Sequence, residues 1–476
     1  MNMASAPGKP FFKYPEEIEH ALKSNFRIIL VDGVVEGRKK DKKAVRKIDE
    51  KTVQAKYDEM ISWLGESPKD QVFRVNTLQR RADKVIDLIK ATDPRSELYQ
   101  FTTFPKVPEL IMVFNKESSE GVENKEINVK AQEAIVKWSS GSAILRGGHV
   151  FGPDIMGLSK SARKDMVVSV FVDTSGTCKP GATTNLQKPK KFLGNGVLIT
   201  RDYAKYKGPV IKMMERITNS PSIDLNLIPP NFVRGQHFPS IICPRILDPK
   251  PDEVVLDISG YAGMETSHIA ALMGNKGKVI ALQRDAARID QFTKRHKEFG
   301  CTNIRIFHLD FEKLVKQNGA KNIKDFDYRP PFPKGSFDRI LVDADCSYLG
   351  LRPLIFYPQN GRSMASWQPR QKKLFTSAVD LLKDGGTLVY ATCTVTIFEN
   401  ESIVAWALKT FPCLELISAR EKYESFELRE FPVSPGYTIR GFNSADAQKV
   451  LRFGPEGDSA GFFIALFRKT NAENDP

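Results

Sequence analysis

One stretch of this 476-residue chain, Glu253 to Gln283, limits its fold more than any other. It opens with a short apolar run that ends at Asp257, and it closes with a second apolar run. Between them lie a helical segment and, before it, a loop of small residues that includes Ser259, Gly260 and Gly263. Because parallel strands need a crossover connection, strand, glycine loop, helix and strand in this order predict one βαβ unit.

The glycine loop of this unit suits a ligand. Glycine lets the backbone approach a bound group closely, and the start of the following helix offers N–H groups without partners. In nucleotide-binding sheets the side chain that ends the second strand often holds a ribose hydroxyl, and here that residue is Gln283. No Gly-x-Gly-x-x-Gly motif occurs in the loop, so a dinucleotide site is not predicted. A tight turn that binds nothing is the competing interpretation.

Composition narrows the class of protein and its partners. The hydrophobic content of 41% and the charged content of 27% are typical of a globular chain. The formal net charge of +14 favours a polyanionic partner, most simply nucleic acid, and a solvated basic surface is the alternative. No apolar run approaches ~18 residues, so no membrane span is expected. The first residues also lack the apolar segment of a secretory signal.

The six cysteines are scattered along the chain and form no Cys-x-x-Cys pair. This spacing argues against a zinc ribbon and is typical of reduced thiols inside the cell. We therefore expect no metal ion, no membrane association, a monomer, and a location in the cytoplasm or the nucleus.

Changes in sequence texture divide the chain into three regions. Residues 1–125 indicate a small α/β, RNA-recognition-like region that ends in a polar linker at 116–125. Helices are expected at 16–23 and 82–91, and strands at 72–77 and 110–114. The segment 37–51 carries many cations, which indicates either a solvated helix face or a contact with an RNA backbone.

In residues 126–214, short apolar segments alternate with glycine and proline turns, which is typical of a small β-barrel. The apolar segments, expected as strands, are 143–145, 149–151 and 167–172. Four lysines are expected in the loops of this barrel, where they would contact phosphates: Lys179, Lys188, Lys190 and Lys191.

Residues 215–476 alternate strands and helices, which predicts an α/β domain with a doubly wound, mostly parallel sheet. Six polar or reactive residues stand at or just after the ends of the predicted strands: Asp257, Gln283, Asp310, Asp343, Cys346 and Cys393. The carboxyl ends of parallel strands meet at the edge where such sheets bind ligands. Each residue alone has a simpler interpretation, as a helix cap or a buried small side chain.

The two cysteines lie in distinctive contexts. The first stands in 341–347, LVDADCS, and the second in 392–394, TCT, ahead of Glu-Asn-Glu at 399–401. With these motifs the chain resembles the NSUN family of RNA cytosine-5 methyltransferases, which pairs Asp-Ala-Pro-Cys-Ser with Thr-Cys-Thr ahead of Glu-Asn-Glu. Further matches lie at 74–77, 236–240, 266–273 and 461–465. The segments 143–150 and 192–196 resemble a PUA domain, as in the branch of the family that modifies tRNA near its acceptor end.

The resemblance implies a Rossmann-like methyltransferase that uses S-adenosylmethionine and acts on RNA, most simply tRNA. It implies that the Cys393 thiolate adds to cytosine C6, a case of covalent catalysis, and that Asp343 is the acid at N3. Cys346 then helps to release the product. The base must be unstacked to be reached. The cofactor residues that it implies are Asp257, Ser259, Gly260, Gly263, Glu265, Gln283, Asp310 and Asp343.

Three residues depart from the family pattern. Glu265 stands where the family has a lysine, Gln283 where it has an acid, and Asp345 where it has a proline. A unit charge ~4 Å away is worth about 1 kcal/mol in water and about 4 kcal/mol at an intermediate dielectric. Asp345 is expected to disfavour the neighbouring Cys346 thiolate. Two hypotheses therefore stand: an active methyltransferase, or a tRNA-binding protein of the same fold with impaired catalysis.

Overall fold

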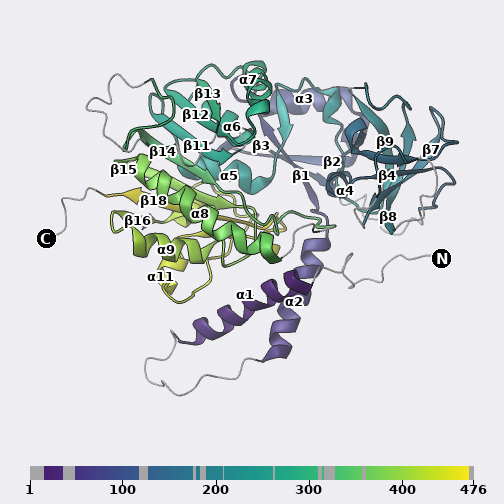
Figure 1. The fold of residues 1–476 in the computed structure, drawn as a ribbon. Coiled ribbons are helices and arrows are strands. Elements are labelled where there is room, and N and C mark those ends of the chain that lie inside the picture. Colours follow the sequence, from purple (N-terminus) through teal and green to yellow (C-terminus); the bar gives the residue numbers. More distant parts are fainter. Residues whose placement is uncertain are drawn as a thin grey trace.

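The computed structural model describes residues 16–35, 49–116, 127–174, 178–182, 189–206, 208–260, 263–308, 314–315, 327–355, 357 and 361–470. Within these residues the strands form three sheets, of four, six and eight strands (Figure 1). The division of the chain into three regions at residues 125 and 214 remains a prediction. One strand of the third region pairs with the sheet of the first region instead, as described next.

The four-stranded sheet is antiparallel, in the order β10 (Val233–Gly235), β1 (Asp70–Val75), β3 (Val107–Asn115) and β2 (Tyr99–Phe104). Helix α3 (Ala82–Thr92) covers one face through Val85 and Ile89, which lie one helical turn apart and are both buried. Strand β10 comes from beyond residue 214, yet it completes this sheet beside β1. The chain thus leaves the sheet after β3 and returns to it after the whole second region.

The six-stranded sheet occupies the second region, in the order β5 (Val150–Phe151), β9 (Pro209–Arg216), β8 (Lys190–Leu198), β7 (Val167–Asp173), β4 (Glu133–Val136) and β6 (Ile155–Leu158). The strand expected at 143–145 is wrong, because these residues end helix α4 (Trp138–Leu145). Ser140, Gly141, Ile144 and Leu145 are its buried residues, and the spacing of three and four between the pairs is that of a helix face. Short apolar runs of this kind do not separate helix from strand.

Two of the four lysines expected in loops of this region lie in a strand instead. Lys190 and Lys191 lie in strand β8, and Lys190 forms an ion pair with Glu133 and stands over the Phe171 ring. Lys179 is in a turn, and Lys188 lies outside the described residues. Lys190 is therefore neutralised within the sheet.

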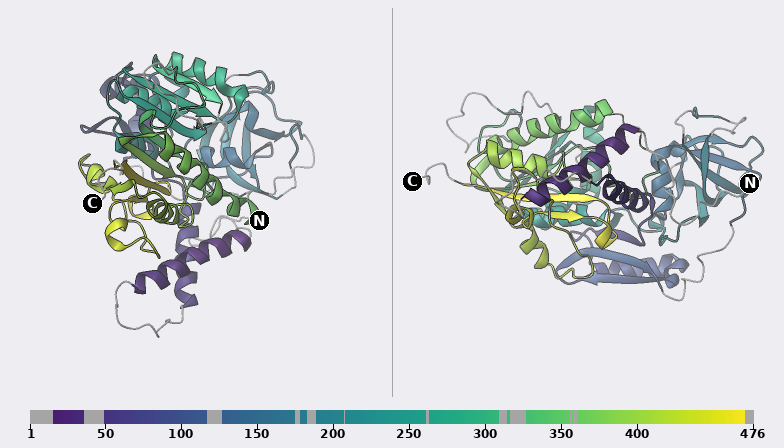
Figure 2. Two further views of the ribbon diagram at one scale, coloured as in Figure 1. Left: turned by 60° about the vertical axis from the view of Figure 1, so that its left-hand side comes forward. Right: turned by 90° about the horizontal axis from the view of Figure 1, so that it is seen from below.

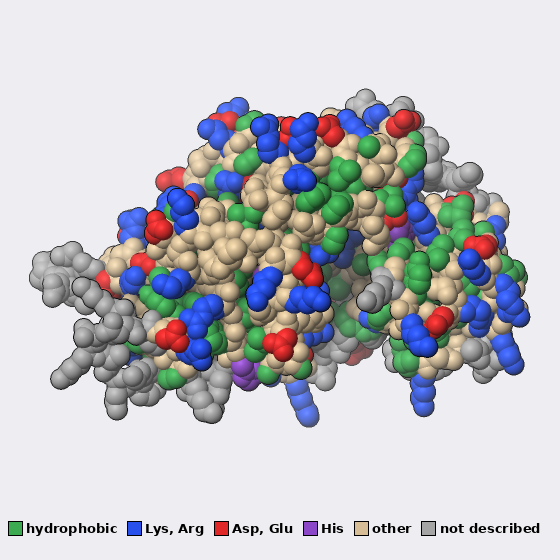
Figure 3. Space-filling model, turned by 90° about the horizontal axis from the view of Figure 1, so that it is seen from above, with side chains coloured by type: hydrophobic (Ala, Val, Ile, Leu, Met, Phe, Trp, Pro, Cys, Tyr) green, Lys and Arg blue, Asp and Glu red, His purple; other side chains and the backbone are tan. Residues whose placement is uncertain are grey.

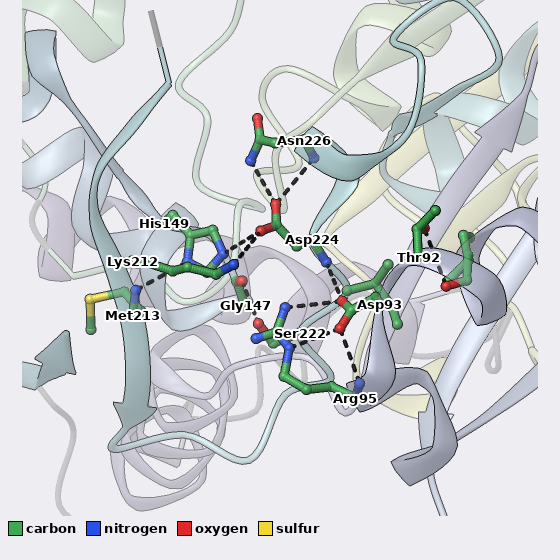
Figure 4. A network of polar contacts seen from close by, with 12 residues as sticks. Thr92, Asp93, Arg95, Gly147, His149, Lys212, Met213, Ser222, Asp224 and Asn226 are labelled. Atoms are coloured by element: carbon green, nitrogen blue, oxygen red, sulfur yellow. Dashed lines mark hydrogen bonds and ion pairs between the residues drawn. The ribbon is translucent and has the colours of Figure 1, made fainter. Parts of the chain in front are cut away.

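A polar network joins the second region to the first sheet (Figure 4). Asp224, which lies in the segment before β10, has its carboxylate 3.4 Å from His149 Nε2 and 3.4 Å from Lys212 Nζ. The backbone N–H of Asp224 donates to Asp93, at the end of α3, over 3.0 Å. The hydrogen bond from His149 holds the pKa of Asp224 well below its usual range. The two regions are thus joined through a buried, ionised carboxylate.

The eight-stranded sheet has the path β13 (Ile304–His308), β12 (Lys278–Gln283), β11 (Val254–Gly260), β14 (Phe337–Asp343), β15 (Leu382–Thr392), β18 (Phe462–Lys469) and β16 (Leu414–Ile417), with β17 (Leu451–Phe453) beside β18. The strands from β13 to β15 are parallel, and β18 runs against its neighbours. The domain is therefore α/β with a mixed, mostly parallel sheet. Strand β18 lies inside the sheet rather than at its edge.

Helices cover both faces of this sheet (Figure 1). One face packs against α5 (Phe238–Leu247), α6 (Met264–Leu272) and α10 (Ala419–Glu424), and the other against α8 (Gly361–Leu381) and α9 (Glu401–Thr410). Helix α7 (Ile289–Glu298) packs Phe292 on Ala281 of β12, and the short α11 (Ser444–Ala447) precedes β17. Because both faces are covered, the central strands are apolar at successive positions, as in Val255 and Leu256.

Two N-terminal helices, α1 (Glu16–Val35) and α2 (Glu50–Gly65), form a hairpin that projects from the body of the molecule (Figures 1 and 2). The buried side chains of this hairpin pack on Leu349, Leu354 and Tyr357, which follow the first cysteine of the motif, and on Val395, which follows the second. The cationic segment 37–51 falls almost entirely outside the described residues. No helix in the described part of the chain has the length and apolarity to cross a membrane.

Candidate active site

The carboxyl ends of β11, β12, β14 and β15 bring the predicted site residues to one edge of the eight-stranded sheet. Asp257 lies in β11, Gln283 ends β12 and Asp343 ends β14, while Cys393 directly follows β15. Since these strands are neighbours in the sheet, the residues converge as the sequence predicts. Asp310, expected at the end of β13, lies outside the described residues.

The two cysteines of the motif are in contact. Their Sγ atoms lie 3.4 Å apart, with Cys346 buried and Cys393 partly exposed. Burial raises the pKa of the Cys346 thiol, and the contact with Cys393 adds to this effect. Cys346 therefore keeps its proton and can donate its S–H to the sulfur of Cys393. A partly exposed thiol beside a buried donor is suited to act as a nucleophile.

Asp345 does not act on Cys346 as expected. Its carboxylate forms an ion pair with Arg284, which follows β12, and accepts a hydrogen bond of 2.7 Å from the Tyr348 hydroxyl. The raised pKa of Cys346 comes from burial and from Cys393, with a smaller contribution from the Glu399 carboxylate. The direction of the shift was predicted correctly, and the cause assigned to it was not.

Glu399 joins the loops that carry the two cysteines. Its carboxylate accepts hydrogen bonds from the Ser347 backbone N–H at 2.9 Å, the Gln371 side chain at 3.0 Å and the Thr396 hydroxyl at 2.8 Å. Burial raises the pKa of this carboxyl. The first residue of the Glu-Asn-Glu motif is thus a structural bridge that fixes one cysteine relative to the other.

The glycine loop begins with a buried carboxyl that the loop itself holds. Asp257 accepts hydrogen bonds from the Ser259 backbone N–H at 3.0 Å and from the Thr266 hydroxyl at 2.5 Å, and the Ser259 hydroxyl also donates to it. Burial raises the pKa of Asp257. The resemblance places Ser259 among the cofactor residues, but in the structure its hydroxyl donates to Asp257 and so stabilises the loop. Gly260 ends β11 and Gly263 is the residue before α6.

Glu265 takes part in a chain of contacts that runs to the first sheet. The Gln236 amide donates to Glu265 over 3.1 Å, and the buried Arg74 guanidinium donates to Gln236 over 2.7 Å. Burial raises the pKa of Glu265, and the nearby Asp257 raises it further. The pKa of Asp343 is also raised, first by burial and then by Glu265 and Asp257. Three carboxyls with raised pKa values thus share this edge of the sheet.

Gln283 is fully buried at the end of β12 and carries an unsatisfied donor. Its Oε1 accepts from the Asp285 backbone N–H over 3.1 Å, while its Nε2 has no partner among the described residues. Buried polar groups normally find partners, so a free donor here indicates a missing acceptor. A ribose hydroxyl of S-adenosylmethionine fits this donor, and the residues present therefore fit the cofactor at this point.

The structure adds residues that the sequence did not single out. Arg74 and Gln236 support Glu265, and Gln371 bonds both Glu399 and the Asp345 carbonyl. Arg74 and Gln236 fall in the segments 74–77 and 236–240 that match the family, which was the one available signal. Nothing in the local pattern around Gln371 indicates its role, because its partners lie on other elements.

Comparison with known proteins relates this site to named enzymes. Residues 244–468 match the sequence family described as 16S rRNA methyltransferase RsmB/F. The human protein named tRNA (cytosine(72)-C(5))-methyltransferase NSUN6 is 34% identical over 484 residues, which cover 95% of this chain and 97% of the human protein. A Pyrococcus horikoshii protein named tRNA (cytosine(72)-C(5))-methyltransferase is 26% identical, with coverage of 87% and 92%.

A solved structure resembles the whole fold. The crystal structure described as NSun6 from Pyrococcus horikoshii with SFG has a TM-score of 0.66 to this chain. The match covers 96% of this chain and 99% of the archaeal chain, at 22% sequence identity. At this identity the likeness concerns the fold alone.

Proposed function

This chain belongs to the NSUN family of S-adenosylmethionine-dependent RNA cytosine-5 methyltransferases, and from that membership we propose that it methylates C5 of cytosine 72 in tRNA. The tRNA and the position are those in the names of the human and archaeal relatives, which match the chain over most of its length. The observation that carries the chemistry is the 3.4 Å contact between Cys346 and Cys393 at the ligand-binding edge of the sheet.

Cys393 is the nucleophile of this mechanism. Its thiolate forms a bond to cytosine C6 as the C5–C6 double bond opens, which makes C5 electron-rich. The buried thiol of Cys346 stabilises that thiolate by donating its S–H over 3.4 Å. The S–H donor is available near neutral pH because burial raises the pKa of Cys346.

Asp343 is the acid at N3 of the base. A carboxyl that delivers a proton must keep it at working pH, and burial together with Glu265 and Asp257 raises the pKa of Asp343. After methylation the C5–H bond breaks and its proton passes to solvent water, its electron pair re-forms the C5–C6 double bond as the C6–S bond breaks, and the Asp343 carboxylate takes back the proton from N3. Cys346 donates a proton to the departing sulfur at this step.

The cofactor residues follow from the same edge. The free Nε2 of Gln283 would hold a ribose hydroxyl, and the loop with Gly260 and Gly263 would admit the cofactor backbone. When bound, S-adenosylmethionine supplies an electrophilic methyl group. Glu265, Asp257 and Asp310 complete the proposed set, and burial raises the pKa of the Glu265 carboxyl, which stands in place of the family lysine.

The other two sheets would bind the tRNA. The first region is proposed as an RNA-recognition-like domain and the second as a PUA-like barrel, with boundaries near residues 125 and 214. Figure 3, which views the molecule from the side of α7 and α3, shows a recess between the two larger bodies, with Lys and Arg side chains on both sides of it. This distribution supports a polyanion that spans both bodies, and we place the protein in the cytoplasm or the nucleus.

Equilibrium dialysis with S-adenosylmethionine and methyl transfer to tRNA transcripts test this function. The expected result is cofactor binding and transfer to a transcript with cytosine at position 72, and no transfer when that cytosine is replaced by uracil. If tRNA binds but the cofactor does not, the chain is the tRNA-binding protein of impaired catalysis. In that case Glu265→Lys should restore cofactor binding, since it returns the cation of the family.

A further inference from the structure

Three arginines away from the thiols share one arrangement. In each, the guanidinium lies over a phenylalanine ring: Arg80 over Phe232 at 4.3 Å, Arg234 over Phe299 at 5.1 Å and Arg295 over Phe292 at 5.3 Å from the ring centre. Throughout the described part of the chain, none of the three has a carboxylate within ion-pair distance. Other arginines of the described residues do have one, as in Arg245 with Glu109 and Arg305 with Asp327.

The three arginines belong to one seam between the first sheet and helix α7. The Asn76 side chain, at the end of β1, donates to the Asn231 carbonyl at 2.8 Å and to the Phe299 carbonyl at 2.6 Å, which joins the two sides of the seam. Phe232 and Arg234 are two positions apart at β10, so they face the same side of an extended chain.

Helix α7 contributes the rest of the seam. Arg295 lies one turn before Phe299, the ring under Arg234. The Arg80 guanidinium reaches the seam from the turn after β1, where its only described hydrogen bond goes to the neighbouring Gln79 carbonyl. Arginines from three separate parts of the sequence therefore meet at one surface.

Placing these cations together is unfavourable unless an anion joins them. Arg234 and Arg295 are close enough to repel each other: the pKa of Arg234 is lowered by burial first and by Arg295 second, and Glu298 offsets this only in part. Like charges at this separation destabilise a fold. The packing of each guanidinium on a ring also reduces the freedom that binding a ligand would have to remove.

We propose that Arg80, Arg234 and Arg295 bind consecutive phosphates of the substrate RNA backbone. This inference rests on the proposed function and adds to it the place where the tRNA backbone is held. Guanidinium presents a planar fork of N–H donors that matches phosphate, and aromatic stacking orients that fork while leaving its donors free. A chain of phosphates at regular spacing fits several separate cations better than a single acidic side chain does.

The position of the seam decides what it contributes. It lies between the first sheet and the end of α7, beside the amino ends of β12 and β13, which form the edge of the sheet opposite the one that carries Cys393. The seam would therefore hold a part of the tRNA away from the reacting base. Phosphate contacts set register and carry no base information. Loss of one should therefore weaken tRNA binding and raise KM, while kcat at saturating tRNA stays the same.

The full-length chain offers a matched control for a test. Arg305 in β13 also lies over a ring, that of Phe307 at 5.2 Å, but it forms an ion pair with Asp327 at 3.1 Å. The experiment measures tRNA affinity by filter binding from 50 to 200 mM KCl. The proteins compared are the parent, Arg80→Gln, Arg295→Gln, the double variant that combines these two changes, Arg234→Lys and the control Arg305→Gln. Each protein is also assayed for kcat and KM and for its melting temperature.

Loss of a phosphate contact removes about 1 from the slope of log affinity against log salt, so the double variant should lose about 2. Arg305→Gln should match the parent, and Arg234→Lys, which keeps the charge at the partly buried site, should retain the slope. The phosphate-binding role of the seam would be contradicted if the slope did not change in the double variant, or if Arg305→Gln lost as much of the slope as the seam variants. A parent that binds tRNA without methylating it would overturn the proposed function alone, since the slopes remain readable, and a parent that binds no tRNA would overturn both.

Discussion

The sulfur atoms of Cys346 and Cys393 lie 3.4 Å apart, although the two residues are 47 positions apart in the chain. Each follows a different strand of the parallel part of the sheet, and those strands are neighbours. A ring carbon bonded to one sulfur would therefore lie within reach of a proton on the other. The pair can divide attack and release between two thiols whose exposure differs.

This division predicts opposite behaviour for the two alanine variants. Cys393→Ala should abolish methyl transfer and leave tRNA binding within about twofold of the parent, because only the nucleophile is removed. Cys346→Ala should accumulate a covalent protein–RNA adduct, because release lacks its proton donor. A denaturing gel with labelled tRNA detects the adduct as a slow band.

Cys413, which is half-buried at the far side of the sheet beside β16, provides the matched control. Cys413→Ala should show parental activity and no slow band. Methyl transfer that survives in Cys393→Ala would remove that residue from the nucleophile role.

Glu265 should make stability depend on pH. Its pKa is raised in the folded state, so below an ordinary carboxyl pKa of about 4.3 it is protonated in both states and has no effect. As pH rises above that value the unfolded state ionises first, and stability falls until the folded carboxyl ionises too. Glu265→Gln removes this loss. The variant should melt about 2–4 °C above the parent at pH 8, which is ~1 kcal/mol for a domain of this size, and equal it at pH 4.

Differential scanning fluorimetry across this pH range checks the prediction, with Glu298→Gln, an exposed carboxyl on α7, as the control. A constant difference between Glu265→Gln and the parent from pH 4 to pH 8 would contradict the raised pKa.

Glu399 should be needed for both stability and rate. Glu399→Ala leaves the Ser347 N–H and the Gln371 and Thr396 donors without acceptors, at about 1–3 kcal/mol for each buried donor that stays unpaired. We expect the free energy of unfolding in urea to fall by about 3 kcal/mol or more. The rate kcat should fall at least tenfold, because the two cysteine loops lose their common anchor. Glu399→Gln keeps one acceptor oxygen, so its stability and its kcat should lie between those of the parent and of Glu399→Ala. An alanine variant with parental kcat would exclude the anchoring role.

Asn25 of the N-terminal hairpin should support the rate without contacting substrate. Its Oδ1 accepts from the buried Ile397 N–H over 3.1 Å, in the loop that follows Cys393. Asn25→Ala leaves that N–H unpaired, which should cost about 1–3 kcal/mol and lower kcat while KM for tRNA is unchanged. Ser24→Ala is the control, because among the described residues the Ser24 hydroxyl bonds only to the His20 carbonyl of its own helix. Equal effects on kcat and KM would indicate a general loss of folded protein instead.

Asp224 should confer stability that acid removes. Its pKa is held low by His149, so its contribution is complete above the usual carboxyl value and is lost as pH falls through the folded value. Asp224→Asn should destabilise the protein by about 2–4 kcal/mol at pH 7, because the buried His149 and the exposed Lys212 lose a charged partner. Thermal melting of parent and variant between pH 3 and pH 7 should converge toward the acid end, and parallel curves would contradict the assignment.

Sequence reasoning succeeded where a signal is local. The apolar runs that end at Asp257, Gln283 and Asp343 predict parallel strands, and their polar ends predict the edge where they meet. Residues 143–145 were assigned wrongly because three apolar residues fit a strand or a helix face equally well. Strand β10 was missed as part of the first sheet, since three residues carry almost no periodic pattern and only pairing with β1 identifies them.

The contacts that shape the site are of the same non-local kind. Arg74 reaches Ser267 across 193 positions, and Asn25 reaches Ile397 across 372. A residue pattern within one segment cannot encode such a partner. The charge at position 345 shows the same limit, because its effect on Cys346 depends on Arg284, which lies 61 positions earlier.

The return of the chain to β10 gives the second region a narrow neck. The Asn115 amide, at the end of β3, donates to the Asn219 carbonyl over 2.5 Å, although 104 positions separate them. Everything between is a single excursion whose entrance and exit are fastened together. On a ribosome, the first sheet stays one strand short until the entire excursion has been synthesised. Because the ends meet, a short turn joining 116 to 219 would bridge the gap. The excursion also carries His149 and Lys212, so any segment exchanged for it has to supply a new partner for the buried Asp224 carboxylate.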